Sequence, residues 1–407
     1  MRILYLNDDW PPAAMGGAAI VAFNLAREVA RRGHEVGVIT TVRNRNEERI
    51  LEEEKMKVYR ICTAYNWRWR AWRSLYNPQT VGKVRKIIRE FKPEVVHAHN
   101  VHLYLSYYCL KIAKKSGAKV YLTAHDVMSF SYEKLKTKKF LEEGDCKLNW
   151  FDRLKQARKR FNPFREIIIR HYLGYVDKII AVSRALKEAL KQNGIGNVKV
   201  IYNGIDVREW ETEEEEVNRL KRVNNLEGKR IVLFGGRLSE AKGGGNIILA
   251  MDKVIKKIPK AVLVVLGERN QYALEMDALI KNMNIGDNII FTGWLSGSSL
   301  KAIYYISDIV CTPSLYLDPF PTVNLEAMAC ARPVVGTCFG GTKELVENGK
   351  SGYIVDPRDI NNMADKIVNL LEDRKKAESF GFYGRERVKK RFNLNNNLDF
   401  MLNIFLK

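Results

Sequence analysis

The 407-residue sequence lacks the long apolar segments and paired cysteines that mark several classes of protein. No apolar run approaches the roughly 18–20 residues that a membrane-spanning helix needs. The opening MRILYLNDDW carries acids where a signal peptide would carry its apolar stretch. The six cysteines form no Cys-x-x-Cys pair, which argues against structural zinc and favours reduced, mostly buried thiols. We therefore expect a globular protein of the cytoplasm.

Several motifs that would define other functions are also absent. The loop after the first predicted strand reads PPAAMGGAA instead of Gly-x-Gly-x-x-Gly, which argues against a dehydrogenase. The glycine-rich stretch 235–245 lacks the Walker A order of glycine, lysine and serine or threonine. No Asp-x-Asp stands at the end of a predicted strand, so we expect neither a metal ion nor a cofactor. No RNP, zinc-finger or KH-like pattern supports a nucleic-acid-binding protein.

Positive charge is plentiful and unevenly distributed. The formal net charge is +21. Residues 1–200 hold 39 Lys and Arg against 20 Asp and Glu, a balance of +19, whereas the remaining residues hold 29 against 27, a balance of +2. Charge bears on partners rather than on fold. The basic half suits an anionic membrane surface, a phosphorylated substrate or nucleic acid.

Short runs rich in valine, isoleucine and leucine alternate with helical patterns along the whole chain. Such runs are typical of parallel strands covered by helices on both faces, and the alternation predicts an α/β protein with doubly wound sheets. We expect two Rossmann-like domains over 1–203 and 204–385, facing a cleft, and a C-terminal helical segment over 386–407 that packs on the first domain. The predicted strands are 2–7, 34–40, 57–62, 94–99, 119–124, 177–182, 198–203, 230–236, 261–267, 288–293, 308–313, 332–337 and 352–356.

The stretch GGRLSEAKGGG at 235–245 directly follows a predicted strand. Glycines let the backbone approach a ligand, and a helix that begins behind them offers N–H groups to an anion. Arg237 adds a forked donor and Lys242 a point charge, and both suit phosphate oxygens. The alternative is a glycine-rich turn with two solvated cations.

The stretch DPFPTVNLEAMA at 318–329 contains two acids, and the second, Glu326, stands among small and apolar neighbours. Pro321 and Thr322 can start a helix whose first N–H groups have no internal partner and attract a phosphate. Glu326, about one turn later, can accept hydrogen bonds from two vicinal hydroxyls such as those of a ribose. Asp318 can reach hydroxyls on a neighbouring sugar. A nucleotide sugar presents ribose, diphosphate and hexose in that order.

These motifs resemble the signature of the retaining glycosyltransferases of family 4, which have the GT-B fold. The resemblance rests on the basic pair Arg237 and Lys242, followed by the acidic pair Asp318 and Glu326, which have seven residues between them. NGID at 203–206 and the Gly-Gly-x-x-Glu that begins at Gly340 agree with it, as does PPAAMGGAA near the N-terminus. The resemblance extends over essentially the whole chain and is weakest over residues 42–80 and 127–163.

The resemblance implies roles for individual residues of the second half. Arg237 and Lys242 would neutralise the diphosphate as it leaves, Glu326 would hold the ribose of the donor, and Asp318 would contact hydroxyls of the donor sugar. The family usually has Glu at the position of Asp318 and Gly at that of Pro321, so this chain departs from the pattern where the sugar binds. The backbone that would hold the distal phosphate belongs to Phe320, Pro321, Thr322 and Val323.

Other positions that the resemblance implicates lie apart from these motifs. His125, in LTAHD, would lie near the reacting carbon of the sugar. Gly16 and Gly17 would border the diphosphate and the acceptor, and the backbone near Leu295 would contact the base. Family members use no firmly established nucleophile, and displacement on one face of the sugar is the favoured mechanism.

The segment HAHNVH places His97, His99 and His102 close together in the sequence. Alternation along a strand puts His97 and His99 on the same side. No acidic residue or cysteine stands nearby in the sequence, so we interpret this segment as a polar strand end rather than a metal site.

The stretch YNWRWRAWRSLYN interleaves Trp67, Trp69 and Trp72 with arginines. Tryptophan and basic residues favour membrane interfaces, and residues 134–165 add further basic segments. They support docking to the inner face of the cell membrane, where a lipid-linked acceptor would be found. A solvated basic surface with locally packed tryptophans is the alternative.

Three classes of function therefore remain in competition. The first is a hexosyltransferase that uses a UDP- or GDP-sugar and a glycan or lipid-linked acceptor, in polysaccharide or glycolipid synthesis. The second is another GT-B enzyme, such as a nucleotide-sugar epimerase, whereas a phosphorylase would need a longer chain. The third is a basic nucleic-acid-binding protein.

Overall fold

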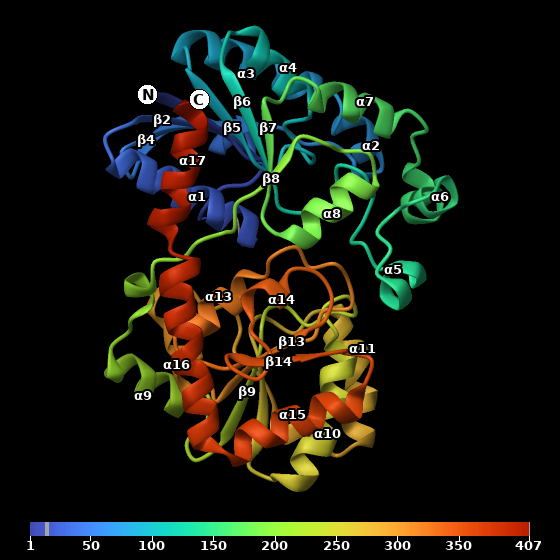
Figure 1. Ribbon diagram of the computed structural model, residues 1–407, viewed down its shortest axis with the longest axis vertical. Coiled ribbons are helices and arrows are strands. Elements are labelled where there is room, and N and C mark those ends of the chain that lie inside the picture. The colour runs from blue at the N-terminus through green and yellow to red at the C-terminus, as the bar shows by residue number, and fades with distance from the viewer. Residues whose placement is uncertain (13–15, 407) are drawn as a thin grey trace. The chain divides into compact units, whose positions relative to one another are not determined.

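The computed structural model describes residues 1–12 and 16–406, and each half of the chain forms an α/β unit (Figure 1). One unit comprises Met1–Asn203 together with Asn395–Lys407, and the other comprises Gly204–Leu394. Residues 13–15, part of the predicted glycine loop near the N-terminus, lie outside the described residues. No described helix combines the length and hydropathy that a bilayer-spanning segment requires.

The first unit contains an eight-stranded sheet in the order β3-β4-β2-β1-β5-β6-β7-β8. All neighbouring strands are parallel except β3 and β4, which are antiparallel. All seven predicted strands of this half are present, and the nearly continuous burial of β1, β2, β5, β6 and β7 matches a sheet covered on both faces. The strands are β1 (Arg2–Leu6), β2 (Glu35–Val42), β3 (Arg49–Glu53), β4 (Met56–Cys62), β5 (Val95–Ala98), β6 (Lys119–Ala124), β7 (Lys178–Ala181) and β8 (Val198–Val200).

Strand β3 is the one strand that the sequence did not predict. It forms a hairpin with β4 through Glu54 and Lys55, which both have positive φ, of 51° and 64°. Two consecutive residues with positive φ are typical of a tight hairpin turn, in which Asn-Gly or Asp-Gly is the usual signal. The strand lies at the edge of the sheet and is largely exposed. An exposed strand does not need a continuous apolar run, so the pattern that predicts the other strands is missing here.

The helices of this unit cover both faces of its sheet, and the C-terminal helix joins them. In α17, Ile404 O accepts a hydrogen bond from the Tyr121 hydroxyl at 2.8 Å, and the Phe405 ring lies 4.7 Å from that of Tyr121. The helices are α1 (Gly17–Arg31), α2 (Arg70–Arg73), α3 (Pro78–Phe91), α4 (Tyr108–Lys115), α5 (Lys138–Glu143), α6 (Trp150–Ala157), α7 (Arg165–Leu173), α8 (Arg184–Gln192) and α17 (Leu394–Leu406).

The second unit contains a six-stranded sheet in the order β11-β10-β9-β12-β13-β14, parallel throughout. All six predicted strands are present: β9 (Arg230–Phe234), β10 (Ala261–Val265), β11 (Ile289–Phe291), β12 (Ile309–Thr312), β13 (Val334–Thr337) and β14 (Gly352–Val355). The helices are α9 (Glu214–Val223), α10 (Gly244–Lys257), α11 (Gln271–Asn282), α12 (Gly297–Ile306), α13 (Thr322–Ala329), α14 (Thr342–Leu345), α15 (Ile360–Glu372) and α16 (Arg374–Arg391).

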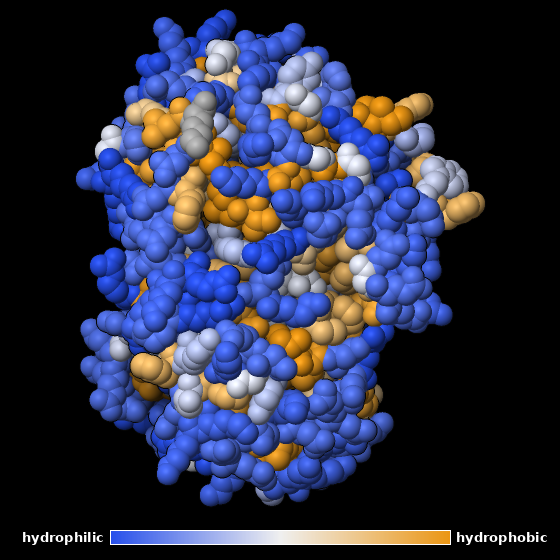
Figure 2. Space-filling view, in the orientation of Figure 1, coloured by the Kyte–Doolittle hydropathy of each residue, from blue (hydrophilic) through white to orange (hydrophobic). Residues whose placement is uncertain are grey.

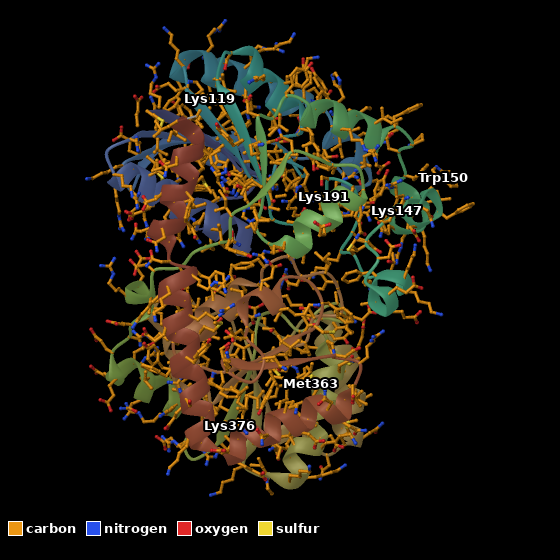
Figure 3. The ribbon with its side chains drawn as sticks, in the orientation of Figure 1. Lys119, Lys147, Trp150, Lys191, Met363 and Lys376 are labelled. Carbon is orange, nitrogen blue, oxygen red and sulfur yellow. The ribbon has the colours of Figure 1, made fainter. Side chains whose placement is uncertain are left out.

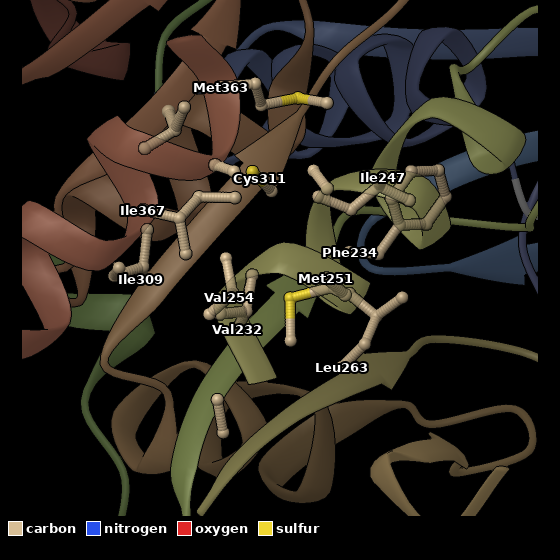
Figure 4. Packing of buried hydrophobic residues seen from close by; sticks show 14 of the residues in the cluster. Val232, Phe234, Ile247, Met251, Val254, Leu263, Ile309, Cys311, Met363 and Ile367 are labelled. Atoms are coloured by element: carbon tan, nitrogen blue, oxygen red, sulfur yellow. The ribbon is translucent and has the colours of Figure 1, made fainter. Parts of the chain in front are cut away.

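The core of the second unit lies between its sheet and helices α10 and α15 (Figure 4). Ile247 and Met251 of α10 pack on β9, and Met363 and Ile367 of α15 belong to the same buried cluster. Cys311 of β12 lies in this core as a buried free thiol, in agreement with the expectation of reduced cysteines. The packed core fixes the carboxyl ends of β9 and β12, where the predicted site residues lie.

In each sheet, the strand order reverses direction beside the first strand of the unit. Chain order runs outward from β1 through β2 and then resumes on its other side with β5, and the same reversal separates β9 from β12. Ligands of doubly wound sheets bind outside the carboxyl ends of the strands at such a switch point. The loops that follow β1, β5, β9 and β12 are therefore where a functional site is expected.

Candidate functional site

The glycines that follow β9 bring two loops of the second unit into contact. A β-carbon placed on Gly235 would lie 2.2 Å from Val323 Cγ1, and one on Gly243 would lie 2.0 Å from Pro313 O. Neither position has room for a larger residue unless its neighbours shift. The loop after β9 thus packs directly on the segment that follows β12 and on the start of α13.

The two predicted cations lie in this same loop but differ in their surroundings. Lys242 is half-buried, and its Nζ donates a hydrogen bond to Gly235 O at 3.4 Å. Arg237 is exposed and, within the described residues, has no acidic partner at ion-pair distance. A guanidinium without a partner and a lysine held against the backbone can both be directed at an anion.

The backbone amides available to that anion differ from the expected ones. The sequence suggested the start of α10, but Gly244 N donates to Ser239 O at 2.9 Å, and Gly245 N donates to the Tyr272 hydroxyl at 3.1 Å. The first amide is engaged because the loop folds back onto the start of the helix, and the second because Tyr272 of α11 lies against it. That part of the expectation is wrong.

Helix α13 offers its first amides instead. Pro321 is its N-cap, and no described side chain caps this end. The amides of Thr322 and Val323 lie in the first turn, where N–H groups have no partner within the helix. The aligned peptide dipoles make this end of the helix attractive to negative charge. An anion site is therefore available beside Gly235.

Glu326 lies one turn into α13, partly buried, and two hydroxyls hold its carboxylate. Tyr304 of α12 donates a hydrogen bond to its Oε2 at 2.5 Å, and the Thr322 hydroxyl donates another. Burial raises the pKa of Glu326, while these hydrogen bonds and the nearby charge of Lys242 act in the opposite direction. The Glu326 carboxylate is therefore a hydrogen-bond acceptor oriented by two hydroxyls near Lys242, not a solvated surface group.

Asp318 is fixed by its own segment and by the Gly-Gly pair of the next loop. Its Oδ2 accepts hydrogen bonds from the Tyr316 hydroxyl at 2.7 Å and from the Ser314 hydroxyl at 3.4 Å. Its carbonyl oxygen accepts from Gly341 N at 2.8 Å, and a β-carbon on Gly340 would lie 2.2 Å from that oxygen. Gly340 has φ of 72°, a conformation that favours glycine. The two glycines hold the backbone of Asp318 in place.

The remaining predicted residues of this unit are arranged less tightly. Phe320 is buried, and its ring lies 5.7 Å from that of Phe392, so it anchors the segment and only its backbone is available to a ligand. Leu295 follows β11, which lies two strands from β9. No described hydrogen bond links it to the other site residues. The structure thus joins Lys242, Glu326 and the start of α13, with Leu295 outside this group.

The first unit carries its own polar residues at the carboxyl ends of its strands. His125 follows β6, and its Nε2 lies 2.8 Å from Nδ1 of His99, which follows β5. The two rings stack with their centroids 5.1 Å apart. Gly17 begins α1, and Gly16 is its exposed N-cap, with no described atom within 4 Å of a β-carbon placed there. The structure does not show His125 and the glycines in direct contact.

The histidines of the predicted polar strand end are buried and mostly paired. His97 and His99 lie on the same side of β5, as alternation predicted, with ring centroids 4.2 Å apart. His97 bonds the Thr123 hydroxyl at 2.7 Å, and His102 Nε2 lies 3.4 Å from Oδ2 of Asp126. Burial lowers the pKa of His125 and of His102 to about 4 and that of His97 to about 3. These imidazoles are therefore neutral at physiological pH.

Some residues that shape the site gave no signal in the sequence. Tyr304 and Tyr316, which orient the two acids, stand in ordinary helix and loop segments. The pairing of His99 with His125 joins residues 26 positions apart, and only the adjacency of β5 and β6 brings them together. The apolar neighbours of Glu326 were the one available hint that this acid needs a partner.

Two family models match the chain and together cover most of its length. The model described as Glycosyltransferase Family 4 matches residues 15–209, and the one described as Glycosyl transferases group 1 matches residues 216–387. The matches correspond to the two halves of the chain that carry the loops described above.

Individual proteins extend this similarity. An uncharacterized glycosyltransferase from Methanocaldococcus jannaschii is 27% identical over 383 residues, which cover 92% of this chain and 90% of that protein. The N-acetyl-alpha-D-glucosaminyl L-malate synthase of Bacillus anthracis is 24% identical over 385 residues, which cover 93% of this chain and 91% of that protein.

Solved structures show the same fold. A sucrose-phosphate synthase from Thermosynechococcus elongatus superposes with a TM-score of 0.78 at 21% identity, covering 99% of this chain and 98% of that one. Anabaena Alr3699/HepE in complex with UDP-glucose superposes with a TM-score of 0.75 at 20% identity, covering 99% of both chains. With two parallel α/β units and sequence matches over both, the chain belongs to the group 1 glycosyltransferases of family 4 and is a glycosyltransferase with the GT-B fold.

Proposed function

We propose that the protein transfers a hexose from a UDP- or GDP-sugar to a glycan or lipid-linked acceptor, with retention of the anomeric configuration. The supporting observation is the arrangement around α13 in the second unit. Glu326 is held by Tyr304 and Thr322 near Lys242, beside uncapped helix amides at the switch point of the sheet. Such a group suits a ligand that carries hydroxyls next to a diphosphate.

The donor is held in this proposal by groups of matching chemistry. Arg237, Lys242 and the amides of Thr322 and Val323 bind the diphosphate. Glu326 accepts hydrogen bonds from the two hydroxyls of the ribose. Positive groups that face the leaving diphosphate stabilise the charge that develops as the sugar–phosphate bond breaks, which is usually the largest electrostatic contribution to such catalysis. The same cations could act without a metal ion.

The hexose and the acceptor involve the other predicted residues. Asp318 binds hydroxyls of the donor sugar, and His125 contacts the sugar near its reacting carbon. Gly16 and Gly17 border the diphosphate and acceptor, and the backbone near Leu295 contacts the base. The bond from the anomeric carbon to phosphate oxygen breaks, and a bond to the acceptor oxygen forms on the same face. The acceptor's proton passes to the departing diphosphate.

The relatives support a nucleotide-sugar donor. Structures of Anabaena Alr3699/HepE contain UDP and UDP-glucose, and a similar mycobacterial enzyme is named as a GDP-mannose-dependent mannosyltransferase. Incubation with UDP- and GDP-sugars and candidate acceptors, followed by NMR of the product, tests the proposal. An α-linked product from an α-linked donor supports it. Consumption of the UDP-sugar without an acceptor, to give an epimer, would support a nucleotide-sugar epimerase instead.

We further propose that the protein docks at the inner face of the cell membrane through an aromatic face of its first unit. Trp67 and Phe151 are 47% and 74% exposed, and residues near α6 and α7 form hydrophobic protrusions on the visible surface (Figure 2). Figure 3 shows Trp150 at α6, near Lys147. The aromatic face comprises Trp67, Trp69, Trp72, Trp150, Phe151, Phe164 and Ile167, all exposed.

The parts of the aromatic face are joined by a small core. Ala71 of α2, Tyr132 and Ala157 of α6 pack together, with Phe161 against them. Trp150 lies 5.6 Å from the Phe161 ring. The tryptophans therefore protrude from a supported surface, where aromatic and basic residues can enter a membrane interface. Flotation with anionic vesicles tests this docking, and equal binding to neutral vesicles at low salt would contradict it.

A further inference from the structure

A basic groove lies between α3 and α4 in the first unit, near the amino ends of β1, β5 and β6. It has a volume of about 760 Å³, and its floor includes Ile88, Pro93 and Ile112. The groove contains one carboxylate, Glu94, whose Oε2 accepts a hydrogen bond from the Arg2 amide at 2.6 Å. Its cations are Arg2, Arg85, Arg89, Lys92, Lys111 and Lys115.

The groove cations differ from other lysines on the same two helices. On α3, Lys83 pairs with Glu48, and Lys86 lies 3.9 Å from Glu90. On α4, Lys114 Nζ bonds Asp177 at 2.6 Å. In contrast, the groove cations Arg85, Arg89, Lys92 and Lys115 form no ion pair with any described residue.

The spacing of these cations places like charges side by side. Arg85 and Arg89 are four residues apart on α3, as are Lys111 and Lys115 on α4, so each pair projects from one helix face. Like charges at this spacing repel each other and destabilise a helix. A bound anion would remove this cost and would be shared by both helices.

Aromatic rings connect the basic groove to the aromatic face. Tyr108, which lines the groove, lies 5.0 Å from the Tyr76 ring and 5.7 Å from the Tyr172 ring of α7. Tyr76 is 47% exposed, and its amide donates to Trp72 O at 3.2 Å. Lys111 Nζ lies 5.8 Å from the centroid of the Tyr108 ring. Tyr108 and Tyr76 thus link the lining of the groove to the segment that carries Trp72.

We propose that the basic groove binds the phosphates of anionic lipid head groups and is a second point of attachment to the membrane. The inference rests on the membrane docking proposed above. A surface that combines unpaired cations with exposed tryptophan and tyrosine matches a bilayer interface, because phosphates lie at the same depth as the aromatic belt. A single-stranded nucleic acid would also use cations and aromatic rings, but the sequence carries none of the RNP, zinc-finger or KH-like patterns of such proteins. The exposed aliphatic side chain of Ile167 on the aromatic face also suits lipid rather than a base stack.

The experiment compares two charge-matched variants of the full chain in sedimentation with vesicles. Arg85→Gln/Arg89→Gln removes two groove cations, and Lys83→Gln/Lys86→Gln removes two cations of the same helix that do not line the groove and lie near Glu48 and Glu90. Vesicles contain phosphatidylcholine with or without 30% phosphatidylglycerol, in roughly 0.15 M salt. We expect the groove variant to bind anionic vesicles roughly 30-fold more weakly than the wild type, since each cation near such a surface contributes about 1 kcal/mol. The control variant should bind anionic vesicles less than roughly 10-fold more weakly than the wild type.

Four results would overturn the inference. Equal loss in the two variants would show that only diffuse charge matters. Unchanged binding by the groove variant would remove the groove from the membrane contact. Tighter, groove-dependent binding of a single-stranded 20-nucleotide RNA than of vesicles would assign the groove to nucleic acid. Inorganic phosphate at 10 mM is included, and full competition by it would indicate a soluble phosphate ligand. A thermal shift with UDP-glucose, measured in parallel on both variants, tests the donor site independently.

Discussion

Gly235 and Val323 approach so closely that a β-carbon on Gly235 would lie 2.2 Å from Val323 Cγ1. This contact seats the glycine loop after β9 against the first turn of α13. It explains how two stretches far apart in the sequence can contribute cations and helix amides to one site. The proposed donor site therefore depends on the absence of a side chain at residue 235.

Replacing Gly235 with alanine should force these two segments apart. We expect Gly235→Ala to lower the free energy of unfolding by about 1–3 kcal/mol, as is usual for overpacking, and to weaken nucleotide binding. Gly286→Ala is the matched control, because a β-carbon there meets no described atom within 4 Å. Urea denaturation and calorimetry with UDP measure both effects. If the two variants behave alike, the contact does not position the site.

Glu326→Gln should separate donor binding from stability. Burial raises the pKa of Glu326, so this group stabilises the fold fully below its unfolded pKa, near 4.5, and that contribution is lost as pH rises through the folded value. At pH 7 the ionised acid is thus a cost that glutamine avoids. We expect the variant to be at least as stable as the wild type at pH 7, while its UDP affinity falls about 10- to 100-fold through loss of charged hydrogen bonds. Lower stability with normal affinity would assign Glu326 a structural role.

Asp318→Ala should affect the sugar more than the nucleotide. The carboxylate is held by Tyr316 and Ser314, away from the Glu326 contacts. We expect unchanged affinity for UDP but at least a roughly 10-fold lower kcat, because an interaction made mainly in the transition state is lost. Asp318→Glu, which restores the usual residue of the family, should retain activity with a changed preference among donor sugars. Reduced UDP affinity in Asp318→Ala would contradict this division.

The buried histidines should make the first unit sensitive to acid. The folded pKa of His97 is about 3 and those of His102 and His125 are about 4, all below the usual 6.5. The unfolded chain therefore takes up protons first as pH falls, so the stability is full above about 6.5 and declines toward pH 4. Urea denaturation at pH 7, 6 and 5 should show this decline. His125→Gln should lower the slope of the free energy of unfolding against pH by the equivalent of close to one proton. A free energy that does not change with pH would exclude neutral burial of these histidines.

The predictable parts of the structure depend on local patterns. Apolar runs predicted thirteen of the fourteen strands in the described part of the chain, since a strand buried on both faces needs continuous apolar residues. Strand β3 is missing from that set because it is an exposed edge strand entered through an uncommon Glu54–Lys55 turn. The acidic residues near α13 were predictable because Glu326 has apolar neighbours.

The remaining details of the site depend on long-range contacts. The role of Tyr304 as the hydrogen-bond partner of Glu326 arises from the packing of α12 beside α13, and nothing near residue 304 indicates it. The pairing of His99 with His125 requires the order of β5 and β6 in the sheet. Amides at the start of α10 seemed available from the sequence, yet a fold-back to Ser239 occupies one of them. Hydrogen-bond partners chosen by tertiary packing carry no local signal.

Calorimetric titration of UDP- and GDP-sugars tests the donor site most directly. We expect a nucleotide sugar to bind the wild type, and Arg237→Ala and Lys242→Ala each to weaken it by about 10- to 100-fold through loss of a charge-assisted contact. Lys256→Ala, on the exposed part of α10, is the control and should bind normally. Wild-type affinity in both Arg237→Ala and Lys242→Ala would contradict the proposed donor site.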